Sequence, residues 1–324
     1  MITLLKKFKN VLNGIATVQH IADNMIYLNG KNAKIKLIGS DINNLFKILP
    51  IIATNNKPLA EVPSGHTFDY DSLIKGSLKE VEFNNEHQLY AMFENCYSNQ
   101  IVCENLELPQ IKIVLDSNNR VPLVNHVYIF DGCLWATDSR YLLKTDLHIN
   151  KDLKTNIPVQ IYNLFKKIVW ICKKDNIIQI YGSIDTKHQI VIQYKELELE
   201  CLDKNINMLR NVSKPLDTCD DGVIYDLTEV TDLKLPNTRM SELVRYNDGL
   251  ISVYDNTFNY NIKEFKHDFK DNLKKFTVDA YYLKLFKKLF KKASIKTFGT
   301  LSGRTTSITM HDNDNSVLIM CIVE

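Results

Sequence analysis

Residues 276–300 read FTVDAYYLKLFKKLFKKASIKTFGT, and this stretch decides the fold because its pattern occurs three times in the chain. The related stretches are FDYDSLIKGSLKEVEFNNEHQLYAMFEN (68–95) and IPVQIYNLFKKIVWICKKDNIIQIYGS (157–183). Each combines an amphipathic helical pattern with β-rich segments and an acidic or proline-marked exit. A spaced repeat indicates supersecondary units that pack against their neighbours. It argues against an enzyme built around one unique pocket.

The spacing of the repeat divides the chain into three predicted domains. The 324 residues are 45% hydrophobic and 24% charged, an ordinary globular composition that can supply two or three cores. We expect an α+β fold of three similar domains at 1–110, 111–213 and 214–324, each with β-sheets and one or two helices. A polar, turn-rich segment at 213–222 marks the last boundary.

Charge, cysteine content and hydropathy limit the classes of function. The formal net charge is +2, so an argument for nucleic-acid binding must rest on where the charges lie. The seven cysteines include no CxxC pair and fit a reducing compartment rather than a metal site. Neither a signal peptide nor an apolar run of about 18 residues is present. We therefore expect a cytoplasmic protein without a cofactor, a metal or a membrane partner.

Turn residues predict several hairpins, and apolar spacing predicts an N-terminal helix. Asn29-Gly30 and Asp131-Gly132 are strong hairpin signals between apolar runs. The segment HDNDN, residues 311–315, is interpreted as another hairpin turn rather than as a metal site. A helix is predicted over residues 2–16 from apolar residues at helical spacing, which are Ile2, Leu5, Phe8 and Leu12.

The predicted helix at 279–292 carries the sharpest charge pattern. Leu283, Phe286 and Phe290 recur at core spacing, and lysines recur on another face with no acidic residue between them. Such a face is most often ordinary solvated surface, but here it recurs in the repeats and at the N-terminus. Lysine stripes suit a surface that follows a phosphate backbone without reading bases. The candidate DNA-binding residues are Lys6, Lys7, Lys9, Lys75, Lys79, Lys166, Lys167, Lys173, Lys174, Lys284, Lys287, Lys288, Lys291 and Lys292.

The segment RVPLVNHVYIFDGCLWATDSRYLLKTDL, residues 120–147, resembles part of the bacterial-type DNA polymerase sliding clamp. In that family a strand pair ends in an A-T-D-G-x-R-L-like turn, and here ATDSR stands at 136–140. The segments YYLKLFKKL (281–289) and SITMHDNDNSVLIMCIVE (307–324) resemble the last helix and the closing strands of the clamp. The order of the elements, the repeat number and the length also fit. The resemblance therefore covers most of the chain.

The resemblance implies a DNA-clamp fold, in which β-sheets form the outer wall of a ring and basic helices line its hole. It implies a homodimer that encircles double-stranded DNA without regard to sequence, has no catalytic residues and tethers a DNA polymerase. Partners, including the polymerase and the clamp loader, would insert a short apolar peptide into a cleft between the second and third domains. Core packing is the alternative role for its apolar residues. By position, the cleft would include Thr137, Ser139, Leu142, Val212, Leu318 and Met320.

The sequence departs from the family pattern at several positions. Ser139 replaces a glycine, so we expect a turn of different shape, and Cys321 replaces a proline. A proline expected near Asn207 is missing. The first halves of the second and third domains lack an obvious helix, so four helices rather than six would line the hole. A ring thinned in this way, with an Asn-, Lys- and Ile-rich composition, suggests a divergent, phage-encoded clamp.

Three other classes of function are the alternatives: a clamp-like binding protein, an enzyme and a purely structural assembly protein. A clamp-like protein that binds replication proteins or a host clamp without encircling DNA is favoured by the missing helices. An enzyme is the weaker alternative, because the motifs GxxxxGK[ST] and GxGxxG do not occur and the histidines are scattered. The segment SGRTTS (302–307) is predicted to lie between strands with no helix after it, unlike a phosphate-binding loop.

Overall fold

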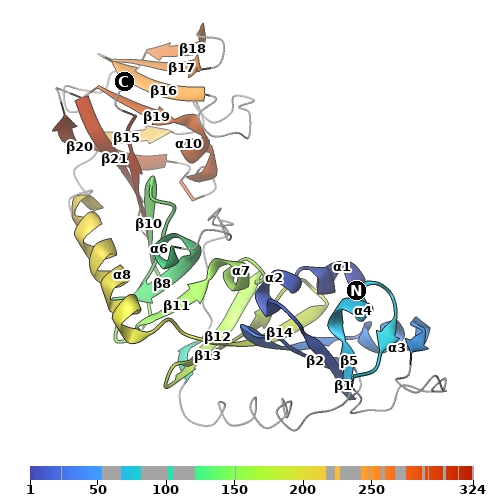
Figure 1. Ribbon diagram of the computed structural model, residues 1–324. Helices are drawn as coiled ribbons and strands as arrows, with labels where there is room; N and C mark the ends of the chain where they lie inside the picture. The colour runs from blue at the N-terminus through green and yellow to red at the C-terminus, as the bar shows by residue number, and fades with distance from the viewer. Residues whose placement is uncertain are drawn as a thin grey trace. The chain divides into compact units, whose positions relative to one another are not determined.

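Strands dominate the computed structural model of the chain (Figure 1). The structure describes residues 1–22, 24–52, 67–81, 101–104, 121–149, 151–216, 223–226, 242–247, 249–256, 260–266, 275–286, 289–290, 292–301, 304–312 and 314–322. The chain divides into two units, 1–108 with 157–199 and 109–156 with 200–324. Each unit therefore combines segments of more than one predicted domain. The limits of the three domains stay a prediction.

An eight-stranded sheet forms the body of the first unit, in the order β5-β1-β2-β3-β14-β13-β12-β7. Along β3, buried residues alternate with partly exposed ones, which is the period of a strand with one face against a core. The strands are β1 (Thr17–Ala22), β2 (Met25–Asn29), β3 (Ala33–Gly39), β5 (Thr67–Asp69), β7 (Ile101–Glu104), β12 (Lys167–Lys174), β13 (Ile177–Ser183) and β14 (His188–Lys195).

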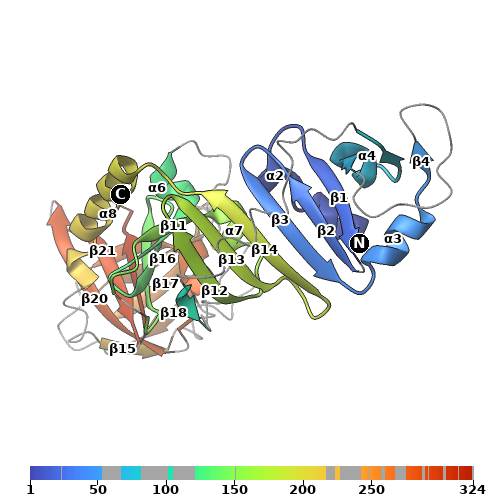
Figure 2. The same ribbon diagram turned by 90° about the horizontal axis from the view of Figure 1, so that it is seen from below.

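The pair β3–β14 joins a strand of the first predicted domain to a strand of the second, and we call this pair the first seam (Figure 2). The two strands are antiparallel, with register from Gly39 opposite His188 to Ala33 opposite Tyr194. Leu37 lies opposite Ile190, and both side chains are fully buried. Buried cross-strand pairs of this kind stabilise the seam.

Short helices accompany the first sheet, and the N-terminal one differs from the prediction. The single helix predicted over 2–16 is wrong, because the chain forms two helices and the second ends at Leu12. Asn13 and Gly14 have positive φ angles of 51° and 80°, a conformation that stops a helix. The elements are α1 (Ile2–Lys6), α2 (Lys9–Leu12), α3 (Ile42–Ile48), α4 (Tyr70–Ile74) and α7 (Val159–Tyr162), with the short strands β4 (Ile51–Ile52) and β6 (Leu78–Lys79).

The helix of the second repeat is shorter than predicted. Helix α7 ends at Tyr162, and β12 begins at Lys167. Residues 168–171 read Ile-Val-Trp-Ile, and β-branched and aromatic side chains favour a strand. Leu164 and Phe165 follow α7 and Ile168 lies on β12, so the amphipathic helical pattern of this repeat extends further in the sequence than the helix does in the structure.

The second unit contains two further sheets. The larger has the order β11-β8-β9-β10-β22-β21-β20-β15, and the smaller has the order β18-β17-β16-β19. The strands of the larger sheet are β8 (His126–Phe130), β9 (Cys133–Thr137), β10 (Tyr141–Asp146), β11 (Thr155–Pro158), β15 (Val223–Asp226), β20 (Lys292–Leu301), β21 (Arg304–His311) and β22 (Asn315–Met320). Those of the smaller sheet are β16 (Glu242–Asn247), β17 (Leu250–Asp255), β18 (Tyr260–Lys266) and β19 (Phe276–Asp279).

The pair β10–β22 joins the second predicted domain to the third, and we call it the second seam. It is antiparallel, with register from Tyr141 opposite Ile319 to Thr145 opposite Asn315. The predicted hairpin turns beside it are confirmed. Asp131 and Gly132 have φ angles of 53° and 77°, which suit a tight two-residue turn. The segment 311–315 joins β21 to β22.

The described residues of the second unit form the helices α6 (Pro122–Asn125), α8 (Leu199–Val212) and α10 (Ala280–Phe286). Helix α6 lies in the first half of the second predicted domain, where no helix was expected, so that expectation is wrong. Helix α8 was not predicted. Leu202, Ile206 and Leu209 of α8 are buried and recur at helical spacing, a signal that the sequence contains. Helix α10 ends well before residue 292, although Leu283, Phe286 and Phe290 are buried as predicted. Within the described residues, no helix has the length and apolar character needed to span a membrane.

Candidate partner-binding site and basic residues

Three of the predicted cleft residues form one row across the second seam. Leu142 of β10 lies opposite Thr137 of β9 on one side and opposite Leu318 of β22 on the other. Residues directly opposite one another share a face of the sheet. All three side chains are buried, so core packing accounts for them as they stand. Met320 lies two residues beyond Leu318, hence on the same face, and is 46% exposed.

The turn between β9 and β10 is fixed by its own side chains. Ser139 has a φ of 75°, in the left-handed region that favours glycine. Its backbone N–H donates to Thr137 Oγ1 at 3.1 Å, and that hydroxyl donates to the Tyr141 carbonyl. Asp138 Oδ1 accepts from the N–H groups of Arg140 and Tyr141 at 2.9 and 3.1 Å. Serine thus occupies a conformation in which a glycine would be unstrained.

Helix α10 supports the same turn from the third predicted domain. The Tyr282 hydroxyl donates to Asp138 Oδ2 at 2.9 Å. The Tyr141 ring lies 5.7 Å from that of Tyr282 and 5.1 Å from that of Phe286, measured between centroids. Tyr282 and Asp138 were not among the predicted site residues. The repeat placed Tyr282 on a helix, but only the folded chain brings it to the turn.

The turn is also bonded directly to the last strand. The N–H of Met320 donates to the Arg140 carbonyl at 2.8 Å. One step further along, the N–H of Cys321 donates to the Thr306 carbonyl at 2.9 Å. Met320 therefore has a fixed backbone and an exposed thioether, which is a suitable combination for an apolar contact with a partner.

Val212 is the last residue of α8 and is 51% exposed. The helix is tied to β8 and the turn after it, since Asn205 Nδ2 donates to the Tyr128 hydroxyl at 2.9 Å. Arg210 forms a bidentate pair with Asp131, with nitrogen–oxygen distances between 2.8 and 3.0 Å. The assignment of Val212 to the cleft stays a prediction.

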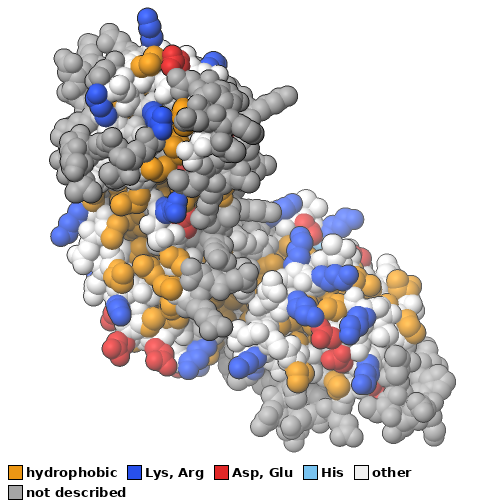
Figure 3. All heavy atoms as spheres, turned by 45° about the horizontal axis from the view of Figure 1, so that its top comes forward, with side chains coloured by type: hydrophobic (Ala, Val, Ile, Leu, Met, Phe, Trp, Pro, Cys, Tyr) orange, Lys and Arg blue, Asp and Glu red, His pale blue; other side chains and the backbone are white. Residues whose placement is uncertain are grey.

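The N-terminal lysines are exposed, as a DNA-contacting surface requires. Lys6 is the last residue of α1, and Lys7 lies in the turn after it. Lys75 is exposed and directly follows the last residue of α4. The Nζ of Lys9 is 3.1 Å from Asp71 Oδ1, so part of its charge is offset. Helices α1 and α4 are joined, because the Tyr70 hydroxyl donates to the Leu5 carbonyl. Figure 3 shows the Lys and Arg side chains of this unit interspersed with acidic ones.

Several predicted DNA-binding lysines lie on strands, so their placement on basic helices is wrong. Lys79 lies on β6. Lys167, Lys173 and Lys174 lie on β12, and Lys292 begins β20. The cause is the early end of the predicted helices, after which β-favouring residues follow. Lys166 is exposed in the segment before β12. The remaining candidates Lys287, Lys288 and Lys291 lie outside the described residues.

Two further lysines, besides Lys9, have acidic neighbours. The Nζ of Lys173 is 2.6 Å from Oε2 of the buried Glu196, which makes Lys173 a structural partner. Lys284 is half-buried on α10. Burial and the charge of Asp255 raise the pKa of Glu242, and Lys284 opposes this rise. In the described part of the chain, no three His, Cys, Asp or Glu residues are grouped so that they could hold a metal ion.

The folded chain is similar to solved sliding clamps over its whole length. The DNA polymerase III subunit beta of Pseudomonas aeruginosa is 12% identical, with a TM-score of 0.59, and the match covers 100% of this chain and 97% of that one. The griselimycin-bound sliding clamp of Bartonella birtlesii is 9% identical, with a TM-score of 0.58 and the same coverage. The sliding clamp of Caulobacter crescentus is 10% identical, with a TM-score of 0.57 and the same coverage.

No protein-family model matches the sequence, and no curated protein does. The likeness therefore rests on the arrangement of the elements. It shows that the chain has the sliding-clamp fold, which confirms the predicted α+β class and the resemblance to the bacterial clamps.

Proposed function

We propose that this chain is a DNA sliding clamp, a non-catalytic processivity factor that encircles double-stranded DNA and tethers a replicative DNA polymerase. The observation that carries the proposal is the match to solved clamps over 100% of this chain and 97% of theirs. A fold shared from end to end, without an inserted catalytic domain, supports a role in enclosing and tethering rather than in chemistry. The proposed setting is the cytoplasm of a bacterial or phage-infected cell.

The exposed lysines of the first unit support sequence-independent contact with DNA. Lys6, Lys7, Lys75 and Lys166 are exposed and carry flexible ammonium groups. Such groups attract phosphates without reading base edges, so binding should weaken steeply as the salt concentration rises. The proposal assigns the contacts to these four residues and to Lys284 of α10.

The exposed Met320 beside a buried apolar row supports a docking site for partner peptides. Leu142 and Leu318 would form its floor, while Met320, Ser139 and Val212 would form its rim. An apolar side chain from the polymerase or the clamp loader would gain free energy by covering the Met320 thioether. The fixed turn at Ser139 offers a preorganised edge for that peptide.

Two measurements test whether the chain forms a closed ring: the mass of the protein in solution, and its retention on a DNA duplex whose free end is blocked. Light scattering over a concentration series should give the mass of two 37.5 kDa chains. The protein is then allowed to thread onto a linear duplex held by one end, and the free end is either blocked with a bound protein or left open. A ring should be retained on the blocked duplex and lost from the open one, even at high salt. Equal loss from both, or a persistent monomer, would contradict the proposal.

The two surfaces can be separated by substitution. Griselimycin is bound to the Bartonella clamp and serves here as a probe. Met320→Asp should weaken its binding and leave retention on DNA unchanged. Lys6→Glu combined with Lys7→Glu should lower the affinity for duplex DNA at low salt and leave griselimycin binding unchanged. Loss of both properties in either variant would contradict the assignment of separate surfaces.

A second candidate is a clamp-like protein that binds replication proteins or a host clamp without encircling DNA. The observation that favours it is the position of Lys167, Lys173 and Lys174 on a strand, which removes three lysines from the predicted helical stripes. A monomer that binds griselimycin but shows no dependence on blocked DNA ends would support this second candidate.

A further inference from the structure

His188 lies between two carboxylates at the end of the first seam. It is the first residue of β14, opposite Gly39 of β3, and its side chain is only 7% exposed. Its Nδ1 is 2.9 Å from both oxygens of Asp185, which precedes it in the β13–β14 turn. Its Nε2 is 2.8 Å from Oδ1 of Asp41, which lies 147 residues away in sequence. One ring therefore contacts both sides of the seam.

The surroundings of the ring are built to hold it there. A Cβ atom at Gly39 would lie 2.4 Å from His188 Cδ2, so no other residue fits beneath the ring without displacing it. Asp185 Oδ1 accepts from the N–H groups of Lys187 and His188 at 2.8 Å each, which fixes the first carboxylate. Asp41 precedes the first turn of α3, yet its side chain makes no capping bond to that helix. Its carboxylate is instead directed to His188.

Both carboxylates are charged at neutral pH. Partial burial acts to raise the pKa of Asp185, but hydrogen bonds from His188 and from the N–H groups of Lys187 and His188 lower it to about 2. Burial likewise opposes the shift at Asp41, whose pKa is nevertheless lowered by the hydrogen bond and charge of His188, with a smaller contribution from the N-terminal amino group. The groups that face the ring are thus two anions, with the N-terminal ammonium acting on one of them.

A ring between two anions needs a proton on each nitrogen. Imidazolium donates from both Nδ1 and Nε2, whereas neutral imidazole donates from one and presents a lone pair at the other. We propose that His188 is a proton-dependent clasp of the first seam, in which the protonated ring binds Asp41 and Asp185 together and loss of the proton releases one of the two contacts. The clasp depends on the fold alone and does not require the proposed clamp function.

The stability of the first seam should depend on pH through two contributions of opposite sign, one from the ring and one from the carboxylates. The contact that needs the second ring proton is made while the ring is charged and is lost when the ring is neutral. The stabilisation from the carboxylates is present above their ordinary pKa of 3.8 and is lost as the pH falls toward about 2, the value for Asp185. The seam should therefore be most stable where the ring and both carboxylates are all charged.

Hydrogen exchange measured by mass spectrometry tests the clasp on the full chain. The peptides that cover 33–39 and 188–195 are followed at pH 5.5 and 8.5 and corrected for the intrinsic exchange rate. In His188→Gln, which keeps the position of Nε2 but no charge, we expect protection at pH 5.5 to fall roughly tenfold below that of the unsubstituted chain, as for loss of a charged hydrogen bond. At pH 8.5 the difference should shrink. His148→Gln at the second seam is the matched control and should leave both peptides within about twofold.

A second measurement on the unsubstituted chain does not depend on whether a variant folds. Nitrogen-15 NMR of labelled histidine reports whether each ring nitrogen carries a proton. For His188 at pH 5.5 we expect both nitrogens to be protonated and slow to exchange with water. An unprotonated ring nitrogen at that pH, or an unchanged pH dependence in His188→Gln, would overturn the proposal.

Discussion

The two seams use the same antiparallel ladder but are held together by different forces. At the first seam, charged groups are buried at both ends of β14, with His188 between two aspartates and Glu196 against Lys173. At the second seam, buried aromatic contacts from Tyr141 to the rings of α10 stand beside buried aliphatic pairs such as Leu142 and Leu318. Its charges lie at the surface.

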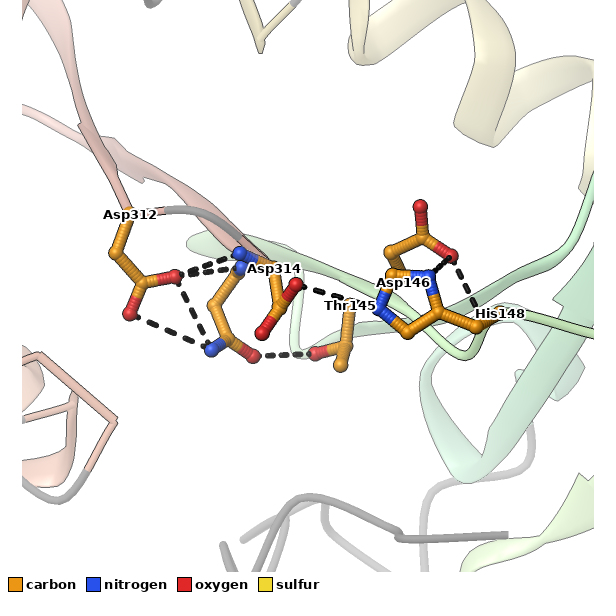
Figure 4. A network of polar contacts seen from close by, with 6 residues as sticks. Thr145, Asp146, His148, Asp312 and Asp314 are labelled. Carbon is orange, nitrogen blue, oxygen red and sulfur yellow. Dashed lines mark hydrogen bonds and ion pairs between the residues drawn. The ribbon is translucent and has the colours of Figure 1, made fainter.

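The surface charges of the second seam form the network drawn in Figure 4. His148 Nε2 is 3.3 Å from Asp314 Oδ1, and Nδ1 is 3.6 Å from Asp146 Oδ1. The His148 side chain is 73% exposed, and both aspartates are more than half exposed. Beneath them, the Thr145 hydroxyl donates to Asn315 Oδ1 at 3.0 Å. A histidine between two aspartates is therefore present at both seams. Only the ring at the first seam is buried, so we expect only that histidine to contribute measurably to stability.

The two seams show how paired strands can be stable while a side chain beside them remains exposed to a partner. Charges that are buried need partners with fixed geometry, and this specifies the first seam. Aromatic packing covers one face of the second seam; on the opposite face Leu142 and Leu318 are also buried, and Met320 beyond them is exposed. A partner-binding surface is thus compatible with the second arrangement.

The largest effect should come from removing the aromatic packing of the second seam. Phe286→Ala deletes a fully buried ring that contacts Tyr141. We expect a loss of about 3–5 kcal/mol in the free energy of unfolding, from lost burial and the cavity left behind. Urea denaturation measures it. Ile48→Ala, which truncates a side chain that is 75% exposed, is the control and should change little. Similar losses of unfolding free energy in Phe286→Ala and Ile48→Ala would contradict a special role for aromatic packing at the second seam.

A smaller effect should come from the buried charge beside β14. Lys173→Ala leaves the Glu196 carboxylate without its partner at 2.6 Å. We expect a loss of about 2 kcal/mol, because an unpaired buried carboxylate retains its desolvation cost. Lys174→Ala, on the next and exposed residue, should stay within about 0.5 kcal/mol of the unsubstituted chain. Equal stability of the two variants would show that the first seam does not depend on this pair.

A glycine in place of Ser139 should stabilise the turn at the second seam. Ser139→Gly removes the steric cost of a φ of 75°. The gain should be about 0.5–1 kcal/mol, less than the full cost of the left-handed conformation because glycine also has more freedom when unfolded. Thermal unfolding measures it. Ser139→Ala keeps the Cβ atom, so its melting temperature should not rise. A rise in both would point to loss of the hydroxyl rather than relief of strain.

The smallest effect should come from the exposed histidine. His148→Gln removes contacts whose partners are all solvated, so the change should lie within about 0.5 kcal/mol. The melting temperature of this variant should follow that of the unsubstituted chain between pH 5.5 and 8.5. A loss as large as that in His188→Gln would break the comparison between the seams.

Local signals in the sequence predicted the elements whose cause is local. The Asp131-Gly132 turn follows from two residues that tolerate positive φ, and the inward face of Leu283, Phe286 and Phe290 follows from helical spacing. The turn at 136–140 was found through its resemblance to the clamps. The residues of α8 carry the same kind of spacing, although no helix was predicted there.

The local sequence was sufficient to predict the hairpin turns and the buried face of Leu283 and Phe286 on α10. Its resemblance to the sliding clamps was sufficient to predict the fold. Only the tertiary structure decided where the helices give way to β12 and β20, which strands pair at the two seams, and that Tyr282 reaches Asp138. It also placed His188 between Asp41 and Asp185. The reason is that turns and helical faces depend on neighbours a few residues away, whereas the pairing at the two seams and the contact of His188 with Asp41 join residues more than a hundred positions apart.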